Sequence, residues 1–527
     1  MKKSIQRQLD ARKRRTKKRI DRANWNGQSP MLACPNVKYE LAEKTQAIAC
    51  GGIGVAQQLV RQLGITESIN RGCPIFMFHM PYSEADHVLN IAFNLFAGGT
   101  CLEHLELRRN DEAYLDALGA QRIPDPTTAG DFCRRFSEAH IQKLMDVLHE
   151  PRVKVWQQQP DSFFDLALIE GDGTMVETCG EKKEGIGMNY KRQWGYHPLV
   201  ITLANTREVL YLANRSGNRP SHEDAAGHFD RSVRLCREAG FRKVRLRGDT
   251  DFSQTTHLDR WHDDGVEFVF GMDAMPNLVE IAENLPDSAW KELKRKPKFV
   301  NKTQQTRAKR PNFKEQFVVK KKYQNKILEQ EFVAEFDYSP TACDHTYRMV
   351  VLRKQVKVMK GQQKLFDDSP YFFYITNLPK QVTPQKVLAE ANSRCDQENI
   401  IAQGKALGAL VAPLNDLLSN WAYMVMAMLA WNLKCWLSLS IKEAGNAAAR
   451  EKRREQKRKL LCMDFNTFRQ HVIQIPAQIL NSGRRLIYRI LTWSPSLETI
   501  FCLHASVSLM ALTLHFPYYE SASFFDF

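Results

Sequence analysis

Residues 162–174 have the sequence SFFDLALIEGDGT, and residues 243–253 have the sequence KVRLRGDTDFS. Each stretch contains a β-type apolar run that leads into a glycine-containing turn, which predicts a short buried strand followed by an open loop. One aspartate stands at the end of each run, Asp172 in the first and Asp249 in the second. A strand fixes the position of a carboxylate just past its end, while the loop leaves that carboxylate accessible.

The segments around these two stretches predict alternating strands and helices. Further strands are expected at residues 198–205, 208–214 and 266–271, and helices at residues 221–239 and 254–261. The resulting order, β-β-β-α-β-α-β with acids at two strand ends, is the pattern of an RNase H-like core. Periodicity by itself gives only an α/β fold. In such a core the strands that carry Asp172 and Asp249 can be neighbours.

The rest of the chain divides by composition into further expected segments. They are a flexible basic arm at 1–30, a helical region at 31–155, the first part of the core at 156–275, a β-rich insertion at 276–380, helices of the last part of the core at 381–445, and a C-terminal region at 446–527 with helices around 465–473 and 477–490. The helical region after the arm is expected to bind DNA or to mediate dimerisation. A plain helical packing domain fits its sequence equally well.

The positive charge of the chain is concentrated in three segments. The 527 residues have a formal net charge of +16 and a balance of 43% hydrophobic and 25% charged residues, which excludes wholesale disorder. Residues 1–25 hold eleven Lys or Arg against two acids, residues 291–326 hold fourteen against two, and residues 450–459 hold seven against two. Each segment alone could be a solvated surface, but together they favour a nucleic-acid partner.

Other features favour a protein of the reducing cytoplasm that does not enter a membrane. The twelve cysteines form no CxxC pair, which excludes a zinc ribbon, and the basic N-terminus has no apolar run of a secretory signal behind it. The apolar segment at 421–437 is interrupted by Asn432 and Lys434. Because a bilayer span needs about 20 apolar residues, a buried core helix is expected there.

Asp172 and Asp249 are candidates for two-metal phosphoryl chemistry. Two ions about 3.5–4 Å apart need several converging carboxylates, and hard oxygen ligands suit Mg²⁺, with Mn²⁺ able to substitute. The alternative is that both are turn residues, since Asp beside Gly is common in turns. Glu170, Asp165 and Asp251 are competing acids nearby, and Glu170 would share a strand face with Asp172.

A third acid is expected on a helix near residue 398. Arg394, Glu398 and Lys405 fall on one helical stripe, which would place basic groups for phosphate one and two turns from a carboxylate. A surface ladder of ion pairs would give the same pattern.

The sequence resembles the DDE transposases of bacterial insertion sequences, of the group-one DDE-domain type. The resemblance is carried by GDGT at 171–174, YK at 190–191, WGYHPL at 194–199, RSGN at 215–218, LRGDTDFS at 246–253, TNL at 376–378 and RCDQEN at 394–399 with Lys405. It implies that Asp172, Asp249 and Glu398 are the catalytic, metal-binding triad, and that Arg394 and Lys405 contact DNA. The family signature has a Tyr where this chain has Ala391, so that role is absent or supplied elsewhere.

The resemblance further implies cut-and-paste transposition in a bacterial cytoplasm, on the nucleoid. A homodimer would bind the terminal inverted repeats of its element, and two Mg²⁺ ions would support cleavage and transfer of the 3′-OH to target DNA. The basic residues expected to contact DNA are Lys13, Arg14, Arg15, Lys294, Arg295 and Lys296. An RNase H-like nuclease that does not join strands, and a catalytically inactive DNA-binding relative, are the alternatives.

Overall fold

The computed structural model describes residues 3–22, 37–39, 45–77, 81–294, 325–360, 371–483 and 485–514. Over these residues the protein is a mixed α/β structure, as the sequence predicts. The chain forms two compact units. The first contains Met1–Phe163, Thr174–Arg219 and Asn399–Phe527, and the second contains Phe164–Gly173 and Pro220–Glu398.

In its described residues the second unit contains seven strands of a mixed sheet, in the order β10-β11-β12-β13-β9-β8-β2. They are β2 Ala167–Gly173, β8 Val244–Gly248, β9 Glu267–Met272, β10 Lys291–Glu292, β11 Asn325–Tyr338, β12 Tyr347–Lys360 and β13 Tyr371–Thr376. The neighbours β2, β8 and β9 are parallel, and the remaining pairs from β9 to β10 are antiparallel. The strands expected from the two Gly-Asp stretches are therefore adjacent.

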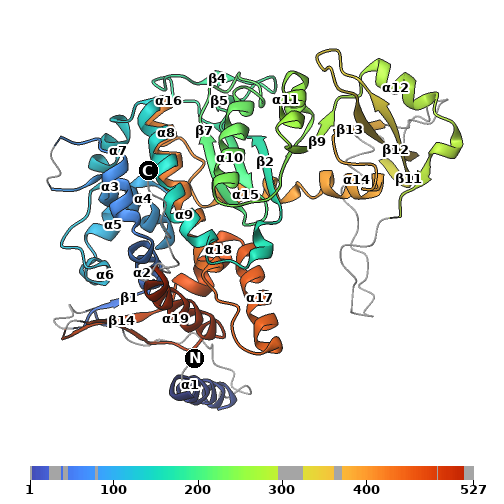
Figure 1. The fold of residues 1–527 in the computed structure, drawn as a ribbon. Coiled ribbons are helices and arrows are strands. Elements are labelled where there is room, and N and C mark those ends of the chain that lie inside the picture. The colour runs from blue at the N-terminus through green and yellow to red at the C-terminus, as the bar shows by residue number, and fades with distance from the viewer. Residues whose placement is uncertain are drawn as a thin grey trace, which may run out of the picture. The chain divides into compact units, whose positions relative to one another are not determined.

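Helices of the second unit pack on parts of this sheet. The helices of the unit are α10 Ala225–Glu238, α11 Leu258–Asp263, α12 Pro276–Glu283 and α14 Pro384–Asn392. Helix α10 packs on β2 and β8, and α14 packs on β9, β11 and β12 (Figure 1). Val350 and Leu352 of β12 meet Val387 and Leu388 of α14 in one buried cluster, which fixes the helix against the sheet.

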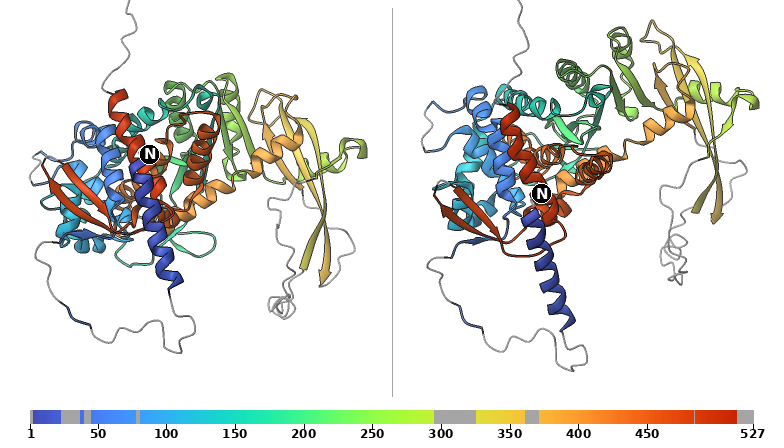
Figure 2. Two further views of the ribbon diagram at one scale, coloured as in Figure 1. Left: turned by 90° about the horizontal axis from the view of Figure 1, so that it is seen from below. Right: turned by 60° about the horizontal axis from the view of Figure 1, so that its bottom comes forward.

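The expected β-rich segment at 276–380 continues the sheet that carries β9. Strands expected around residues 332–334 and 349–351 are present within β11 and β12, which run side by side as a long hairpin (Figure 2). Strand β13 then pairs with β9 through Phe373 opposite Met272. The β-type run at 317–319 lies outside the described residues.

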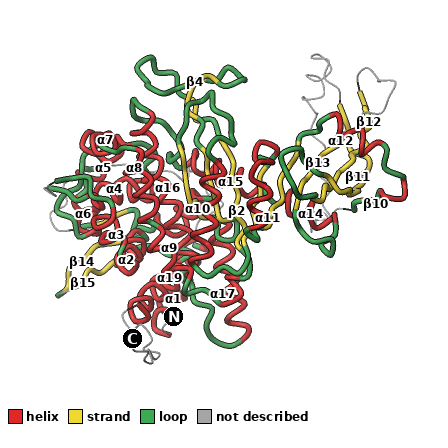
Figure 3. Tube along the Cα trace, turned by 45° about the horizontal axis from the view of Figure 1, so that its top comes forward, coloured by secondary structure: helices red, strands yellow, loops and turns green. Residues whose placement is uncertain are grey.

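The first unit is mainly helical (Figure 3). Its helices are α1 Lys3–Asp21, α2 Ile53–Leu63, α3 Ile65–Gly72, α4 Glu84–Phe96, α5 Leu105–Arg109, α6 Glu112–Leu118, α7 Pro126–Arg134, α8 Glu138–Val147, α9 His149–Trp156, α16 Leu417–Leu439, α17 Ala447–Cys462, α18 Phe465–Phe468 and α19 Leu497–Leu514. Helix α15, Cys395–Ala406, begins at the last residues of the second unit and continues into the first.

Helix α16 is the apolar centre of the first unit. It is long and apolar enough to cross a membrane, but its whole apolar window is buried inside the protein. Its two polar interruptions have internal partners, because Asn432 accepts a hydrogen bond from the Val209 backbone at 2.9 Å and Lys434 donates to the Leu461 carbonyl at 2.7 Å. The expected buried core helix is thus present.

Short strands complete the first unit. They are the pair β6 Leu199–Leu203 and β7 Glu208–Ala213, the small sheet of β3 Val176–Glu177, β5 Trp194–Tyr196 and β4 Gly187–Met188, and the small sheet of β1 Ala47–Ile48, β14 Ala477–Ser482 and β15 Arg485–Ile490.

Two expectations for this unit are wrong. Residues 477–490, expected as a helix, form the β14–β15 hairpin, because Gly483 takes the left-handed conformation (φ +60°) that turns the chain back. Residues 3–21, expected as part of a flexible arm, form α1, since Lys, Arg, Gln and Leu favour helices. Arg12 fastens this helix by donating to the carbonyls of Ile490 and Thr492 at 2.8 and 3.0 Å.

Candidate active site

Asp172 and Asp249 lie at the same level of two neighbouring parallel strands. In the β2–β8 pair, Glu170 stands opposite Arg247. Each aspartate is two residues further along its own strand direction, so both carboxylates come to the same end of the sheet. Asp249 directly follows β8 as expected, whereas β2 continues to Gly173 and therefore includes Asp172.

The third expected acid approaches the same end of the sheet from the helices that follow β13. Helix α14 ends at Asn392 and α15 begins at Cys395, so that Arg394 lies in the short break between them. The Arg394 guanidinium is 3.8 Å from Asp249 Oδ2. Glu398 is exposed in the first turn of α15. Asp249, Arg394 and Glu398 line one pocket of about 460 Å³.

Negative charge accumulates at this position. Burial, the charge of Asp249 and that of Glu398 raise the pKa of Asp172 to about 7, against the opposing effect of Arg394. Burial also raises the pKa of Asp249, and Arg394 again acts in the opposite direction. The single Arg394 guanidinium thus offsets only part of the negative charge of these acids. Such an excess of negative charge is typical of a site that binds cations.

The side chains at this site have the chemistry that suits divalent cations. The carboxylates of Asp172, Asp249 and Glu398 offer the hard oxygen ligands that Mg²⁺ prefers, and the pKa of Asp172 is raised first by burial and then by the negative charges of Asp249 and Glu398. Among the described residues, no three His, Cys, Asp or Glu side chains are already arranged as ligands of one ion.

The sequence matches a family model described as transposase DDE domain group 1 over residues 45–511. The chain belongs to this family. It is a DDE transposase, and the resemblance of the sequence motifs to the group-one DDE domain is confirmed. A comparison with curated proteins gave no match.

A comparison with solved structures found the piggyBac transposase in a cryo-EM synaptic complex with hairpin DNA. The two chains share 8% sequence identity, and the match covers 80% of this transposase and 81% of the piggyBac chain at a TM-score of 0.34. At that TM-score the likeness carries no argument about this chain.

The acids that competed with the expected triad have other partners in the transposase. Glu170 is fully buried and forms an ion pair with Arg247 at 2.6 Å. Asp165 pairs with Arg242, and Glu390 of α14 pairs with Arg245. These contacts occupy Glu170 and Asp165, two of the three competing acids, and also Glu390. The third competing acid, Asp251, donates its backbone N–H to Asp249 Oδ1 at 3.1 Å.

The basic residues expected to contact DNA lie in different surroundings. Lys13, Arg14 and Arg15 are exposed on α1. Lys294 pairs with Glu292 at 3.3 Å, while Arg295 and Lys296 lie outside the described residues. Lys405 of α15 donates to the Met175 carbonyl at 2.8 Å, and burial lowers its pKa.

The Thr376-Asn377-Leu378 motif of the transposase is structural. The Asn377 side chain accepts a hydrogen bond from the Phe268 backbone at 2.9 Å and donates to the Val266 carbonyl at 2.8 Å. Thr376 Oγ1 donates to the Phe268 carbonyl at 2.6 Å. These side chains bond the backbone at the start of β9 as a neighbouring strand would, and so hold the end of β13 in place.

Sequence reasoning missed two kinds of residue near the acids. Buried Arg247 contacts Glu170 and the exposed Ser393, and the sequence pattern shows Arg247 only as a member of the LRGDTDFS motif. Tyr371 and Tyr374 line the same pocket as Ala391, the position at which the family signature has Tyr. A run of aromatic residues, YFFY at 371–374, was the available signal.

Proposed function

We propose that this transposase cleaves DNA at the terminal inverted repeats of its element and joins the freed 3′-OH to target DNA, in cut-and-paste transposition. The observation that supports this most directly is the shared level of Asp172 and Asp249 on parallel strands, with Arg394 and Glu398 beside them. The proposal assigns the catalytic core to the RNase H-like class and its action to the bacterial cytoplasm.

In this proposal the three acids hold two Mg²⁺ ions, which Mn²⁺ can replace. Bound ions would supply positive charge to the attacking and leaving oxygens of the phosphodiester. Arg394 would then turn from Asp249 to phosphate, a contact for which its planar fork is suited. Lys405, on the same helix as Glu398, would provide a second cation for the DNA backbone.

The proposed partner is duplex DNA, bound by a homodimer. Arm residues Lys13, Arg14 and Arg15 would contact phosphates independently of sequence, as would the basic segment that contains Lys294, Arg295 and Lys296. Position and register on the element end would come from such contacts, whereas cleavage depends on the acids.

The test uses purified protein, a duplex that carries an element end, target DNA and Mg²⁺, with the cut positions mapped on both strands. Asp172→Ala, Asp249→Ala and Glu398→Ala are each expected to abolish cleavage and to bind the end with nearly unchanged affinity. Asp165→Ala is the control, because it removes an exposed acid that precedes the same strand and pairs with Arg242.

Three outcomes discriminate the alternatives. Normal cleavage by one of the three variants would remove that residue from the site. Cleavage without any joined product would favour a nuclease that does not transfer strands. Binding without cleavage by the wild-type protein would favour an inactive DNA-binding relative.

A further inference from the structure

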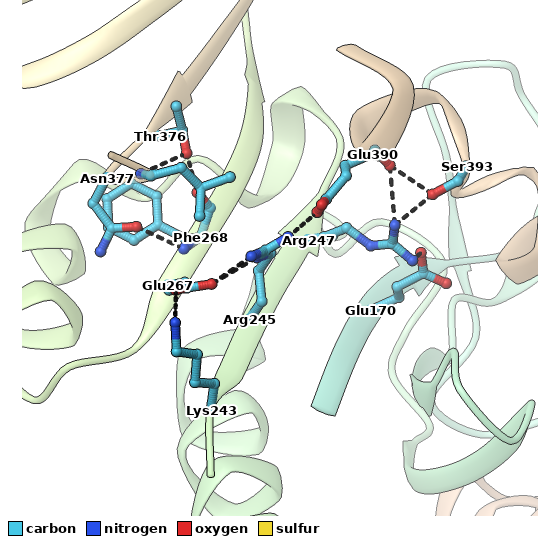
Figure 4. A network of polar contacts seen from close by, with 11 residues as sticks. Glu170, Lys243, Arg245, Arg247, Glu267, Phe268, Thr376, Asn377, Glu390 and Ser393 are labelled. Atoms are coloured by element: carbon cyan, nitrogen blue, oxygen red, sulfur yellow. Dashed lines mark hydrogen bonds and ion pairs between the residues drawn. The ribbon is translucent and has the colours of Figure 1, made fainter. Parts of the chain in front are cut away.

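One buried guanidinium contacts all three segments that carry the proposed catalytic acids. Arg247 of β8 pairs with Glu170 of β2 at 2.6 Å, and it also contacts Ser393 Oγ and donates to the Glu390 carbonyl at 3.0 Å (Figure 4). All of these residues belong to the second unit.

The sequence offsets of these contacts match the acids. Glu170 precedes Asp172 by two residues, and Arg247 precedes Asp249 by two residues. Ser393 directly precedes Arg394 and comes five residues before Glu398. The guanidinium, two residues before Asp249 on its own strand, therefore touches the chain two residues before Asp172 and five residues before Glu398.

A contribution to folding stability does not by itself explain why the ion pair between Arg247 and Glu170 is buried. The Arg247 side chain is 4% exposed and that of Glu170 is 0% exposed. Taking two charges out of water costs more than their attraction commonly returns, so apolar replacements of buried pairs are often neutral or stabilising. The benefit of the pair must then lie in where it holds the chain.

We propose that Arg247 is a positioning residue that keeps the segments bearing Asp172, Asp249 and Glu398 in one arrangement, so that the three carboxylates can bind cations together. This inference rests on the proposed function. The planar fork of Arg donates in several fixed directions at once, which lets one side chain reach a second strand and the end of α14. Lysine, with a single ammonium, lacks this geometry.

Arg245 provides a matched control. It lies two residues earlier on β8, pairs with Glu267 at 2.6 Å and contacts the Glu390 side chain, and is nearly as buried as Arg247 (Figure 4). It makes the same kind of contact with α14 and the sheet. No contact with Glu170 or Ser393 is found for it among the described residues.

The experiment compares Arg247→Lys with Arg245→Lys in the full-length protein, using Mn²⁺ binding by calorimetry, kcat for cleavage, affinity for the element end, and hydrogen exchange at residues 393–398. Arg247→Lys is expected to weaken Mn²⁺ binding and lower kcat by about 10- to 100-fold, as loss of a supporting partner does at metal sites. Exchange at residues 393–398 should speed up, and affinity for the element end should change less than twofold. Arg245→Lys should stay within about threefold of wild type in Mn²⁺ binding.

A double variant separates positioning from folding. Glu170→Gln with Arg247→Met leaves no buried charge unpaired, so it is expected to melt within a few degrees of wild type and still to show the Mn²⁺ defect. Wild-type Mn²⁺ binding by Arg247→Lys or by the double variant would overturn the inference. Equal losses in Arg245→Lys and Arg247→Lys would overturn it as well, because the effect would then be general to buried arginines of β8.

Failure of the proposed function gives a different result. If Asp172→Ala and Asp249→Ala bind Mn²⁺ as wild type does, the acids are not the metal site. The exchange comparison at residues 393–398 still decides whether Arg247 positions this segment.

Discussion

Asp172 stores unfavourable electrostatic energy in the metal-free protein. Its pKa is raised to about 7 by burial and by the charges of Asp249 and Glu398. A carboxyl that titrates higher in the folded than in the unfolded state binds an extra proton on folding between the two pKa values. Stability therefore falls as pH rises from about 4 to 7, and the full penalty is present at pH 8. A functional acid commonly has such a cost.

Asp172→Asn is consequently expected to stabilise the metal-free protein at pH 8, by about 1 kcal/mol or more. The gain should shrink as pH falls from 7 toward 4 and vanish below about pH 4, where the wild-type carboxyl becomes protonated in the unfolded state as well. Thermal melting in chelator across this pH range measures it. Asp165→Asn, at an exposed ion pair, should change stability by less than about 1 kcal/mol at any of these pH values. A destabilised Asp172→Asn at pH 8 would contradict the electrostatic account.

The acids could be predicted from the sequence, and the network beneath them could not. Local pattern was enough to place Asp172 and Asp249 at the ends of strands, whereas their assignment to a metal-binding triad came from the family resemblance and stays a prediction. Glu170 was predicted to share a face with Asp172, but only the register between β2 and β8 reveals that Arg247 is its partner. Pairing between strands far apart in sequence leaves no periodic signal, so neither Arg247 nor Ser393 could be assigned a position.

Some helices and strands could be predicted from the sequence, and others could not. The apolar run of α16 and the buried strands β6, β7, β8 and β9 gave clear signals. Residues 477–490 did not, because Ile, Leu and Tyr occur in helices and strands alike and only the turn at Gly483 separates the two. The continuation of the β9 sheet into β13, β12 and β11 is likewise a property of strand pairing, which composition does not encode.

Lys434 of helix α16 is a basic residue in a buried position. The side chain is fully buried, donates to the Leu461 carbonyl at the end of α17, and lies 4.2 Å from the ring centre of Trp431. Burial lowers the pKa of Lys434 to about 8. Because the unfolded chain then binds more protons between about pH 8 and 10.5, wild-type stability should rise with pH in that window.

Lys434→Met removes this titration, so its stability should not show the rise between pH 8 and 10.5. The rise in wild type is expected to reach up to about 3 kcal/mol. Urea unfolding of both proteins at pH 7.5, 9 and 10 measures the difference in slope. Lys380→Met is the control, since Lys380 is exposed and pairs with Asp337, and it should follow wild type. Parallel pH profiles for Lys434→Met and wild type would show that Lys434 does not titrate in this window.

The sequence shows where the positive charge of the whole chain is concentrated, whereas the structure describes only part of the segments that carry it. Two of the three basic segments are seen as helices, α1 and α17, and most of the third lies outside the described residues. In α17, Arg454 and Lys457 pair with Glu443, and Lys452 pairs with Glu498. Arg450, Arg458 and Lys459 are exposed, with no ion pair found among the described residues.

If α17 contributes to the DNA footprint, its exposed cations are the ones that release counterions. The variant Arg450→Gln/Arg458→Gln/Lys459→Gln should therefore lower affinity for element-end and random duplex alike, and reduce the slope of log affinity against log salt by about 2 to 3, near 0.9 per phosphate contact. The corresponding change of Lys13, Arg14 and Arg15 in α1 should do the same while leaving Arg12 to fasten the helix.

The control removes equal charge from exposed arginines that already pair with acids, in the variant Arg71→Gln/Arg109→Gln/Arg134→Gln. Because each of these guanidiniums already has a carboxylate partner, removing them should release fewer counterions and alter the slope less than the α17 variant does. Equal slopes for the α17 variant, the control and wild type would mean that α17 is a solvated surface, and that its charge serves solubility and not DNA binding.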